Sequence, residues 1–137
     1  MTRVPGVLFL CVHNAGRSQM GAAWMRHLGG DSVRVFSAGS APGEAVNPSA
    51  VEAMDEVGID ISGERPQRLT DEMLDAVDVV VTMGCGDACP VLPGKRYLDW
   101  PLEDPAGQGV EMVRQVRDQV EAKVRGLLAE FTAAGAP

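Results

Sequence analysis

The sequence is poor in the residues that build disulfide frameworks, zinc centres and membrane spans. It has three cysteines, an odd number that does not fit a paired disulfide scaffold. Its two histidines lie in separate segments, which argues against a zinc site. No apolar run approaches the roughly 20 residues of a membrane span. The first run, 7–12, is also short for a secretory leader. We therefore expect a cytoplasmic protein with reduced cysteines.

Basic runs are also missing, and the formal net charge is −7. A chain with this balance is not expected to bind nucleic acid. Any anion site must then be local, made by backbone dipoles and one or two arginines. The 137 residues contain no repeat, linker or low-complexity segment. We expect one domain over residues 1–137, acting as a monomer.

Short apolar runs alternate with amphipathic segments along the chain. The predicted strands are 7–12, 33–40, 78–83 and 95–100, and the predicted helices are 17–28, 48–57, 70–77 and the segment from 110 onward. This alternation predicts an α/β fold with a four-stranded parallel sheet, in strand order 2-1-3-4, flanked by helices on both faces. Ligands of such sheets bind beyond the carboxyl ends of the strands.

The segment Cys-Val-His-Asn-Ala-Gly-Arg-Ser directly follows the first predicted strand. Cys11 and Arg17, six positions apart around a turn, could face one point, and the following helix adds partial positive charge. Such surroundings favour a thiolate and an oxyanion, and the Ser18 hydroxyl could donate to the sulfur. The alternative is a core cysteine and a solvated arginine. The predicted oxyanion site comprises Val12, His13, Asn14, Ala15, Gly16 and Arg17, with Cys11 as nucleophile.

Cys85 and Cys89 share one segment after the third predicted strand. Four positions on a helical turn would place their Cα atoms about 6 Å apart, within disulfide range. We interpret them as a redox pair, although two nearby cysteines could also be buried or bind a metal. Asp99, near the end of the fourth predicted strand, and Glu103 and Asp104, after it, are alternative candidates for a general acid.

Several segments together resemble the low-molecular-weight protein tyrosine phosphatase family, and in particular its arsenate reductase branch. The matching segments are Val7–Ser18, Ser37-Ala38-Gly39, Asn47-Pro48, Asp60-Ile61-Ser62, Val79–Met83, Cys89-Pro90 and Asp104–Gly107. The resemblance covers nearly the whole chain. It implies a phosphatase-like four-stranded sheet and the thiol-based reduction of arsenate to arsenite. It also implies Asp104 as the general acid, because this carboxyl group immediately precedes a proline.

The resemblance implies a relay in which Cys11 attacks arsenate, Cys85 attacks Cys11, and Cys89 resolves the disulfide. No cofactor is expected to be bound. Electrons would come from thioredoxin, or from a thiol such as mycothiol with a mycoredoxin-like protein, and phosphate or sulfate would compete with arsenate. Some relatives bind potassium through a glutamate on the first helix, where this chain has Ala22, so no metal is expected. The alternatives are a phosphatase of phosphate monoesters and a thiol-based module binding arsenite or a soft metal.

Overall fold

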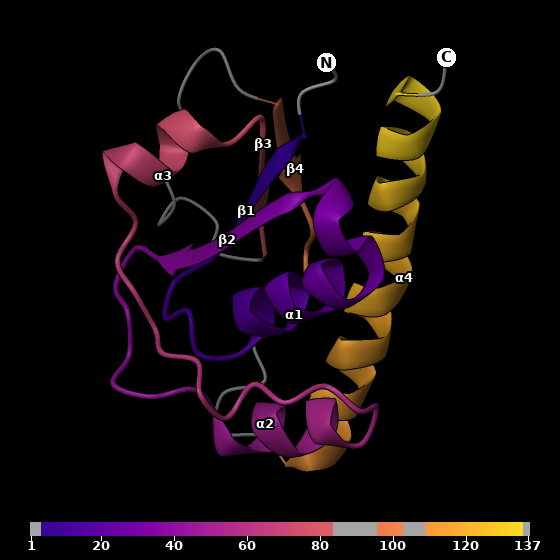
Figure 1. Cartoon of the computed structure of the whole chain (residues 1–137). Helices are drawn as coiled ribbons and strands as arrows, with labels where there is room; N and C mark the ends of the chain where they lie inside the picture. The colour runs from indigo at the N-terminus through magenta and orange to yellow at the C-terminus, as the bar shows by residue number, and fades with distance from the viewer. Residues whose placement is uncertain (1–3, 84–95, 103–108, 136–137) are drawn as a thin grey trace.

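A sheet of four parallel strands lies at the centre of the described part of the chain, residues 4–83, 96–102 and 109–135 (Figure 1). In this computed structural model the strand order is β2-β1-β3-β4, as predicted. Every neighbouring pair is parallel, and Cys11 at the end of β1 is in register with Gly39 at the end of β2. The strands are β1 (Gly6–Cys11), β2 (Arg34–Gly39), β3 (Val79–Thr82) and β4 (Arg96–Asp99).

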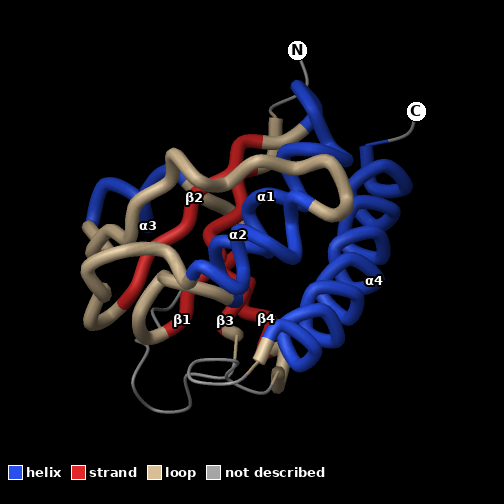
Figure 2. Tube along the Cα trace, turned by 90° about the horizontal axis from the view of Figure 1, so that it is seen from below, coloured by secondary structure: helices blue, strands red, loops and turns tan. Residues whose placement is uncertain are grey.

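Helices cover both faces of the sheet, which confirms the predicted architecture (Figure 2). One face carries three helices and the other carries α3, and a short 3-10 turn, η1, joins α1 to β2. The bounds are α1 (Arg17–Gly29), η1 (Gly30–Ser32), α2 (Pro48–Asp55), α3 (Asp71–Ala76) and α4 (Val110–Gly135). Each predicted boundary lies within two residues of the observed one.

The side chains of β1 alternate between two apolar cores because successive residues of a strand point to opposite faces. Val7 and Phe9 lie in the larger core, under α1, α2 and α4, while Leu8 and Leu10 lie in the smaller core under α3. All six residues of β1 are buried, as expected for a central parallel strand. A Cβ atom at Gly21 of α1 would lie 2.6 Å from the Phe9 ring. The start of α1 therefore packs very closely on β1.

The long helix α4 closes the larger core with one apolar stripe. Its buried residues recur at spacings of three and four, at Val113, Val116, Val120, Val124 and Leu127. Among the described residues, no helix is both long enough and apolar enough to cross a membrane.

Candidate active site

The loop between β1 and α1, residues 12–16, leaves the sheet at its carboxyl edge, where sequence analysis places the oxyanion site (Figure 1). Because the sheet is parallel, β3 and β4 end at the same edge. Cys85, Cys89 and Asp104, which follow those strands in the sequence, lie outside the described residues. The described part of the site consists of the loop and the segments that contact it.

Six consecutive carbonyl groups, from Cys11 to Gly16, each accept a hydrogen bond from outside the loop. Most of the donors are N–H groups of the segment between β2 and α2, and one is a side chain. The donors are Ser40 N (3.3 Å) to Cys11, Ala41 N (2.8 Å) to Val12, Gly43 N (2.9 Å) to His13, Gln19 Nε2 (3.0 Å) to Asn14, Asn47 N (2.7 Å) to Ala15 and Met20 N (2.9 Å) to Gly16. The carbonyl oxygens are thus turned away from the inside of the loop.

In a trans peptide the C=O of one residue and the N–H of the next point in opposite directions, and the described residues contain no cis bond. The outward carbonyls therefore direct the N–H groups of His13 to Gly16 inward. Asn14 has φ = 50°, the left-handed conformation that asparagine tolerates, and it curves the loop. Successive N–H groups in such a curve form an anion-binding concavity. The backbone of residues 13–16 has the geometry of such a concavity, which we call the cradle, and its binding of an oxyanion stays a prediction.

The N-terminus of α1 has no side-chain cap and no acidic residue in its first turn. In contrast, Asn47 Oδ1 accepts from Ser49 N at the start of α2, and the Thr70 hydroxyl accepts from Met73 N at the start of α3. The partial positive charge of α1 is therefore not neutralised by its own sequence. An uncapped helix start beside a ring of N–H groups suits an external anion.

Cys11 is 2% exposed, and its sulfur lies 2.9 Å from the Ser18 hydroxyl oxygen. Asn14 Nδ2 donates to the same oxygen at 2.7 Å. Since Ser18 accepts from the Asn14 amide, its single proton remains available for the sulfur. A hydroxyl donor stabilises a thiolate relative to a thiol. The sequence prediction for Ser18 agrees with this contact.

Arg17 is 4% exposed, so the alternative of a solvated arginine on a helix is wrong. Its Nη1 donates to the carbonyl oxygen of Leu102 at 3.3 Å, which joins the loop to the chain beyond β4. A guanidinium group recognises oxyanions through paired N–H donors. His13 is exposed and contributes its backbone to the loop.

Two glutamines that sequence analysis missed fix the side chain of Asn14. Gln19 Nε2 lies 3.2 Å and Gln67 N lies 2.9 Å from Asn14 Oδ1. Gln19 directly follows Ser18, so its nearness to the loop could have drawn attention to it. No spacing rule identifies Gln67, which is 53 positions from Asn14 and acts through its backbone. Asn47 entered the sequence analysis only as part of a family-like segment, whereas its side chain caps α2 and its N–H holds the Ala15 carbonyl.

A sequence profile of the low molecular weight phosphotyrosine protein phosphatases matches residues 6–136. The chain belongs to this family. The family resemblance predicted from the sequence is confirmed, and so is the phosphatase-like sheet.

Relatives of this phosphatase-family chain include several proteins named as arsenate reductases. The glutaredoxin arsenate reductase of a Synechocystis strain is 39% identical over 129 residues, which cover 92% of the chain and 98% of that protein. The thioredoxin-dependent arsenate reductase of Corynebacterium glutamicum superposes with a TM-score of 0.81 at 42% identity. That match covers 97% of this chain but only 64% of the longer one. An arsenate reductase solved in its phosphate-binding state gives a TM-score of 0.84 at 38% identity, covering 93% and 98%.

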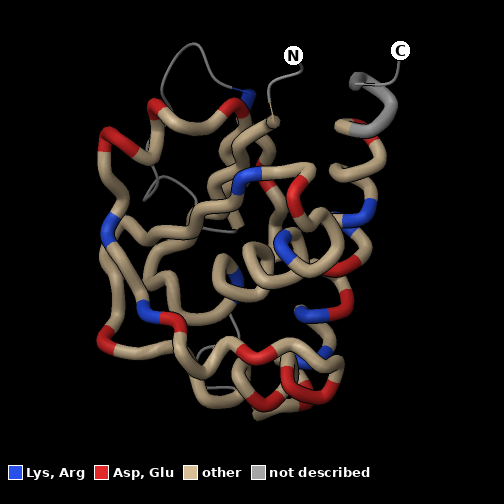
Figure 3. The backbone as a smooth tube through the Cα atoms, viewed as in Figure 1, with Lys and Arg blue, Asp and Glu red and all other residues tan. Residues whose placement is uncertain are grey.

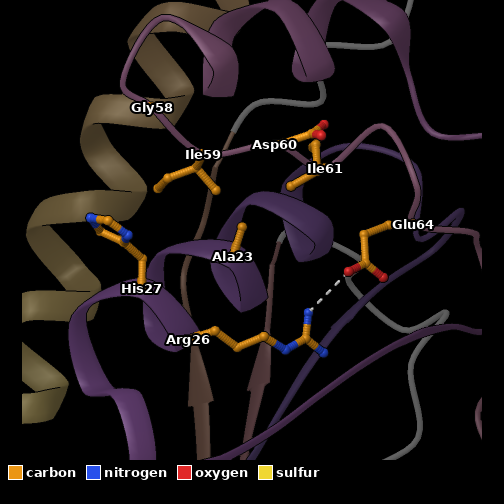
Figure 4. A pocket seen from close by; sticks show the side chains of 8 residues that line it. All are labelled: Ala23, Arg26, His27, Gly58, Ile59, Asp60, Ile61 and Glu64. Carbon is orange, nitrogen blue, oxygen red and sulfur yellow. Dashed lines mark ion pairs between the residues drawn. The ribbon is translucent and has the colours of Figure 1, made fainter.

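A separate cavity of about 340 Å³ lies between the last two turns of α1 and the segment after α2 (Figure 4). Ala23 and Ile59 line it, and Arg26 bridges to Glu64 at 3.7 Å. The rise of a helix places Arg26 roughly 13 Å along α1 from Arg17. This cavity is therefore distinct from the cradle of the phosphatase-family site.

Metal ligands do not gather in the described part of this phosphatase-family chain, where no three His, Cys, Asp or Glu side chains come together. Ala22 is fully buried. The sequence predicts no potassium ligand at this position. That no metal is bound remains a prediction.

Proposed function

We propose that the chain reduces arsenate to arsenite, with Cys11 as the nucleophile. The observation that carries the proposal is the Cys11 sulfur, held by the Ser18 hydroxyl at the base of a loop whose carbonyls all point outward. Similarity to arsenate reductases over nearly the whole chain supports the same reaction. The cradle alone would also suit a phosphatase, and the proposed thiol pair, Cys85 and Cys89, favours the reductase.

The reaction would begin when the Cys11 thiolate attacks arsenic. An oxygen of arsenate leaves as water, with Asp104 as the proposed proton donor. The Cys85 thiolate then attacks the Cys11 sulfur and forms a disulfide. The electron pair of the As–S bond remains on arsenic, so As(V) becomes As(III) and arsenite leaves. Cys89 attacks Cys85, which releases the Cys11 thiolate and leaves a Cys85–Cys89 disulfide.

An external dithiol would return the Cys85–Cys89 pair to its reduced form. The relatives include one protein named for thioredoxin and one named for glutaredoxin, and we propose thioredoxin or a mycoredoxin-like protein as the reductant. The relay needs no bound cofactor or metal and takes place within one chain, in agreement with a monomer. It requires a reducing compartment, which supports a cytoplasmic location. Phosphate or sulfate would occupy the same cradle and compete with arsenate.

A coupled assay tests the proposal. Arsenate, thioredoxin, thioredoxin reductase and NADPH are supplied to the reduced protein, and NADPH loss is followed. We expect arsenate-dependent turnover that C11S and C85S abolish. C89S should complete about one reduction per protein and then stop, because the Cys11–Cys85 disulfide is not resolved. S62A, an exposed position away from the loop, serves as the control and should turn over like the parent.

Three outcomes would contradict the relay. Turnover that survives both C85S and C89S would favour attack by an external thiol on the Cys11 adduct. Absence of arsenate-dependent turnover, together with rapid cleavage of an aryl phosphate, would identify a phosphatase. Stoichiometric binding of arsenite without any turnover would identify a thiol-based binding module.

A further inference from the structure

Gln19 is a buried polar side chain whose amide contacts the loop at Asn14. It is 2% exposed, and its Nε2 lies 3.0 Å from the Asn14 carbonyl, 3.2 Å from Asn14 Oδ1 and 3.3 Å from the Arg65 carbonyl. Both carbonyl oxygens can only accept, so the amide nitrogen is the atom that must face them. The two N–H groups of one amide are thus shared among three oxygens.

The contact with the Asn14 carbonyl fixes the direction of one N–H donor of the cradle, that of Ala15. Five of the six outward carbonyls are held by backbone N–H groups, and the Asn14 carbonyl is held by the Gln19 side chain. Because the peptide is trans, the Ala15 N–H points inward when the Asn14 carbonyl points outward. The direction of the Ala15 N–H therefore depends on a replaceable side chain.

The second contact sets the orientation of the Asn14 amide. Gln67 N and Gln19 Nε2 both donate to Asn14 Oδ1, which leaves Asn14 Nδ2 directed at the Ser18 oxygen. Ser18 in turn has its proton available for the Cys11 sulfur. One side chain thus supports both the oxyanion cradle and the hydrogen bond to the nucleophile.

We propose that Gln19 is a positioning residue that couples oxyanion binding in the loop to the reactivity of Cys11. The inference rests on the proposed function only in that the loop binds an oxyanion. Gln19 itself touches neither the oxyanion nor the sulfur. Its removal would let the Asn14–Ala15 peptide rotate and would leave Asn14 Oδ1 held by Gln67 N alone.

The test compares Q19M, which keeps the length and removes the donors, with Q119M, an exposed glutamine-to-methionine control on α4. Phosphate binding is measured by calorimetry and Cys11 alkylation by peptide mass spectrometry. We expect Q19M to bind phosphate at least about 10-fold more weakly, equal to about 1.4 kcal/mol, and to alkylate Cys11 several-fold more slowly. Q119M should match the parent in both measurements. Binding within twofold of the parent, at the parental alkylation rate, would overturn the proposal.

Q19E separates hydrogen bonding from packing within a single protein. A carboxylate at pH 8 has no donor for three oxygens, whereas its protonated form at pH 5 restores one. The ratio of variant to parent phosphate affinity should therefore rise as the pH falls, and a ratio independent of pH would argue for a packing role. If the parent binds no phosphate, the proposed function fails. The alkylation comparison, which needs no oxyanion, then decides on Gln19 alone.

Discussion

At the scale of single residues, the site depends on which atom donates to which. The Ser18 hydroxyl donates to the sulfur when Cys11 is a thiolate, because a thiolate can only accept, and the Asn14 amide leaves the Ser18 proton available for this bond. Asn14 Nδ2 occupies the Ser18 oxygen as a donor, and Gln67 N keeps the Asn14 amide in that orientation. The hydrogen bond to Cys11 is therefore directed by contacts two side chains away from the sulfur.

Ser18→Ala should slow the alkylation of Cys11. The substitution removes the donor to the sulfur and leaves the Asn14 amide without its acceptor. A hydrogen bond to a charged group contributes about 1.5–3 kcal/mol, so we expect roughly a 10-fold lower rate with iodoacetamide at pH 7, followed by mass spectrometry of the Cys11 peptide. Ser32→Ala, at an exposed serine beyond α1, is the control. Equal rates for all three proteins would show that Ser18 does not act on the sulfur.

Residue types and spacing predicted the parts of the site that are adjacent in the chain. Cys11, Arg17 and Ser18 were predicted because a strand, a turn and a helix start follow one another. Gln67 and the second role of Asn47 were missed, since both act through backbone N–H groups of distant segments. A backbone donor leaves no trace in the residue type, so the sequence could not reveal it.

At the scale of elements, the segment between β2 and α2 acts as a frame for the loop. Its N–H groups hold the carbonyls of Cys11, Val12, His13 and Ala15. The last residue of β2, directly before the frame, lies so close to the loop that a Cβ at Gly39 would be 2.6 Å from the Val12 oxygen and 3.0 Å from the Asn14 nitrogen. Both neighbours are backbone atoms, which cannot move aside without changing the cradle.

Gly39→Ala should therefore destabilise the protein and weaken oxyanion binding together. Overpacking of this kind typically costs about 1–3 kcal/mol, so we expect a lower urea midpoint in chemical unfolding and a weaker calorimetric signal for phosphate. Gly43→Ala lies four residues further on, between β2 and α2, where the added Cβ meets its nearest atom at 3.8 Å, and should behave like the parent. A Gly39→Ala protein with parental stability and phosphate affinity would show that the frame tolerates displacement.

The elements themselves were predictable because their patterns are strong. The apolar run 7–12 and the valines of 79–81 mark central strands, and Asn47-Pro48 marks the start of α2, where the structure has an asparagine cap and Pro48 as first residue. What the patterns could not indicate is how closely α1 lies on β1. That distance depends on Gly21 facing the Phe9 ring, a pairing between two elements rather than a periodicity within one.

At the scale of the whole molecule, a charged cluster ties α2 to α4. Acidic residues gather along α2 and the adjoining end of α4 (Figure 3). There Glu56 contacts Arg114 at 2.6 Å and Arg117 at 2.8 Å, and Arg117 also donates to the Ala53 carbonyl at 2.9 Å. Hydrogen bonds from Arg114 and then from Arg117 lower the pKa of Glu56 from 4.5 to about 2.

This lowered pKa gives the stability a defined dependence on pH. The Glu56 carboxylate stabilises the fold above the unfolded-state pKa of 4.5, and this contribution is lost as the pH falls through about 2. We expect Glu56→Gln to unfold at lower urea than the parent at pH 7. The difference should shrink between pH 4.5 and 2, and at high salt, because the side chains are partly exposed. Glu72→Gln, at an exposed position of α3, is the control. A difference that stays constant down to pH 2 would exclude the charge as its cause.

Six donors turn the loop carbonyls outward, and all six lie within residues 19–47. These residues follow the loop closely in the sequence. The donors that shape the anion receptor are therefore encoded in the first third of the chain, and later residues add contacts to its side chains through the backbone groups of Arg65, Gln67 and Leu102. The proposed redox thiols and proton donor belong to two other short segments of the sequence. Substitutions confined to those two segments would leave the carbonyl donors in place and would change the fate of the covalent adduct. Hydrolysis and reduction can thus be exchanged in evolution without rebuilding the binding site.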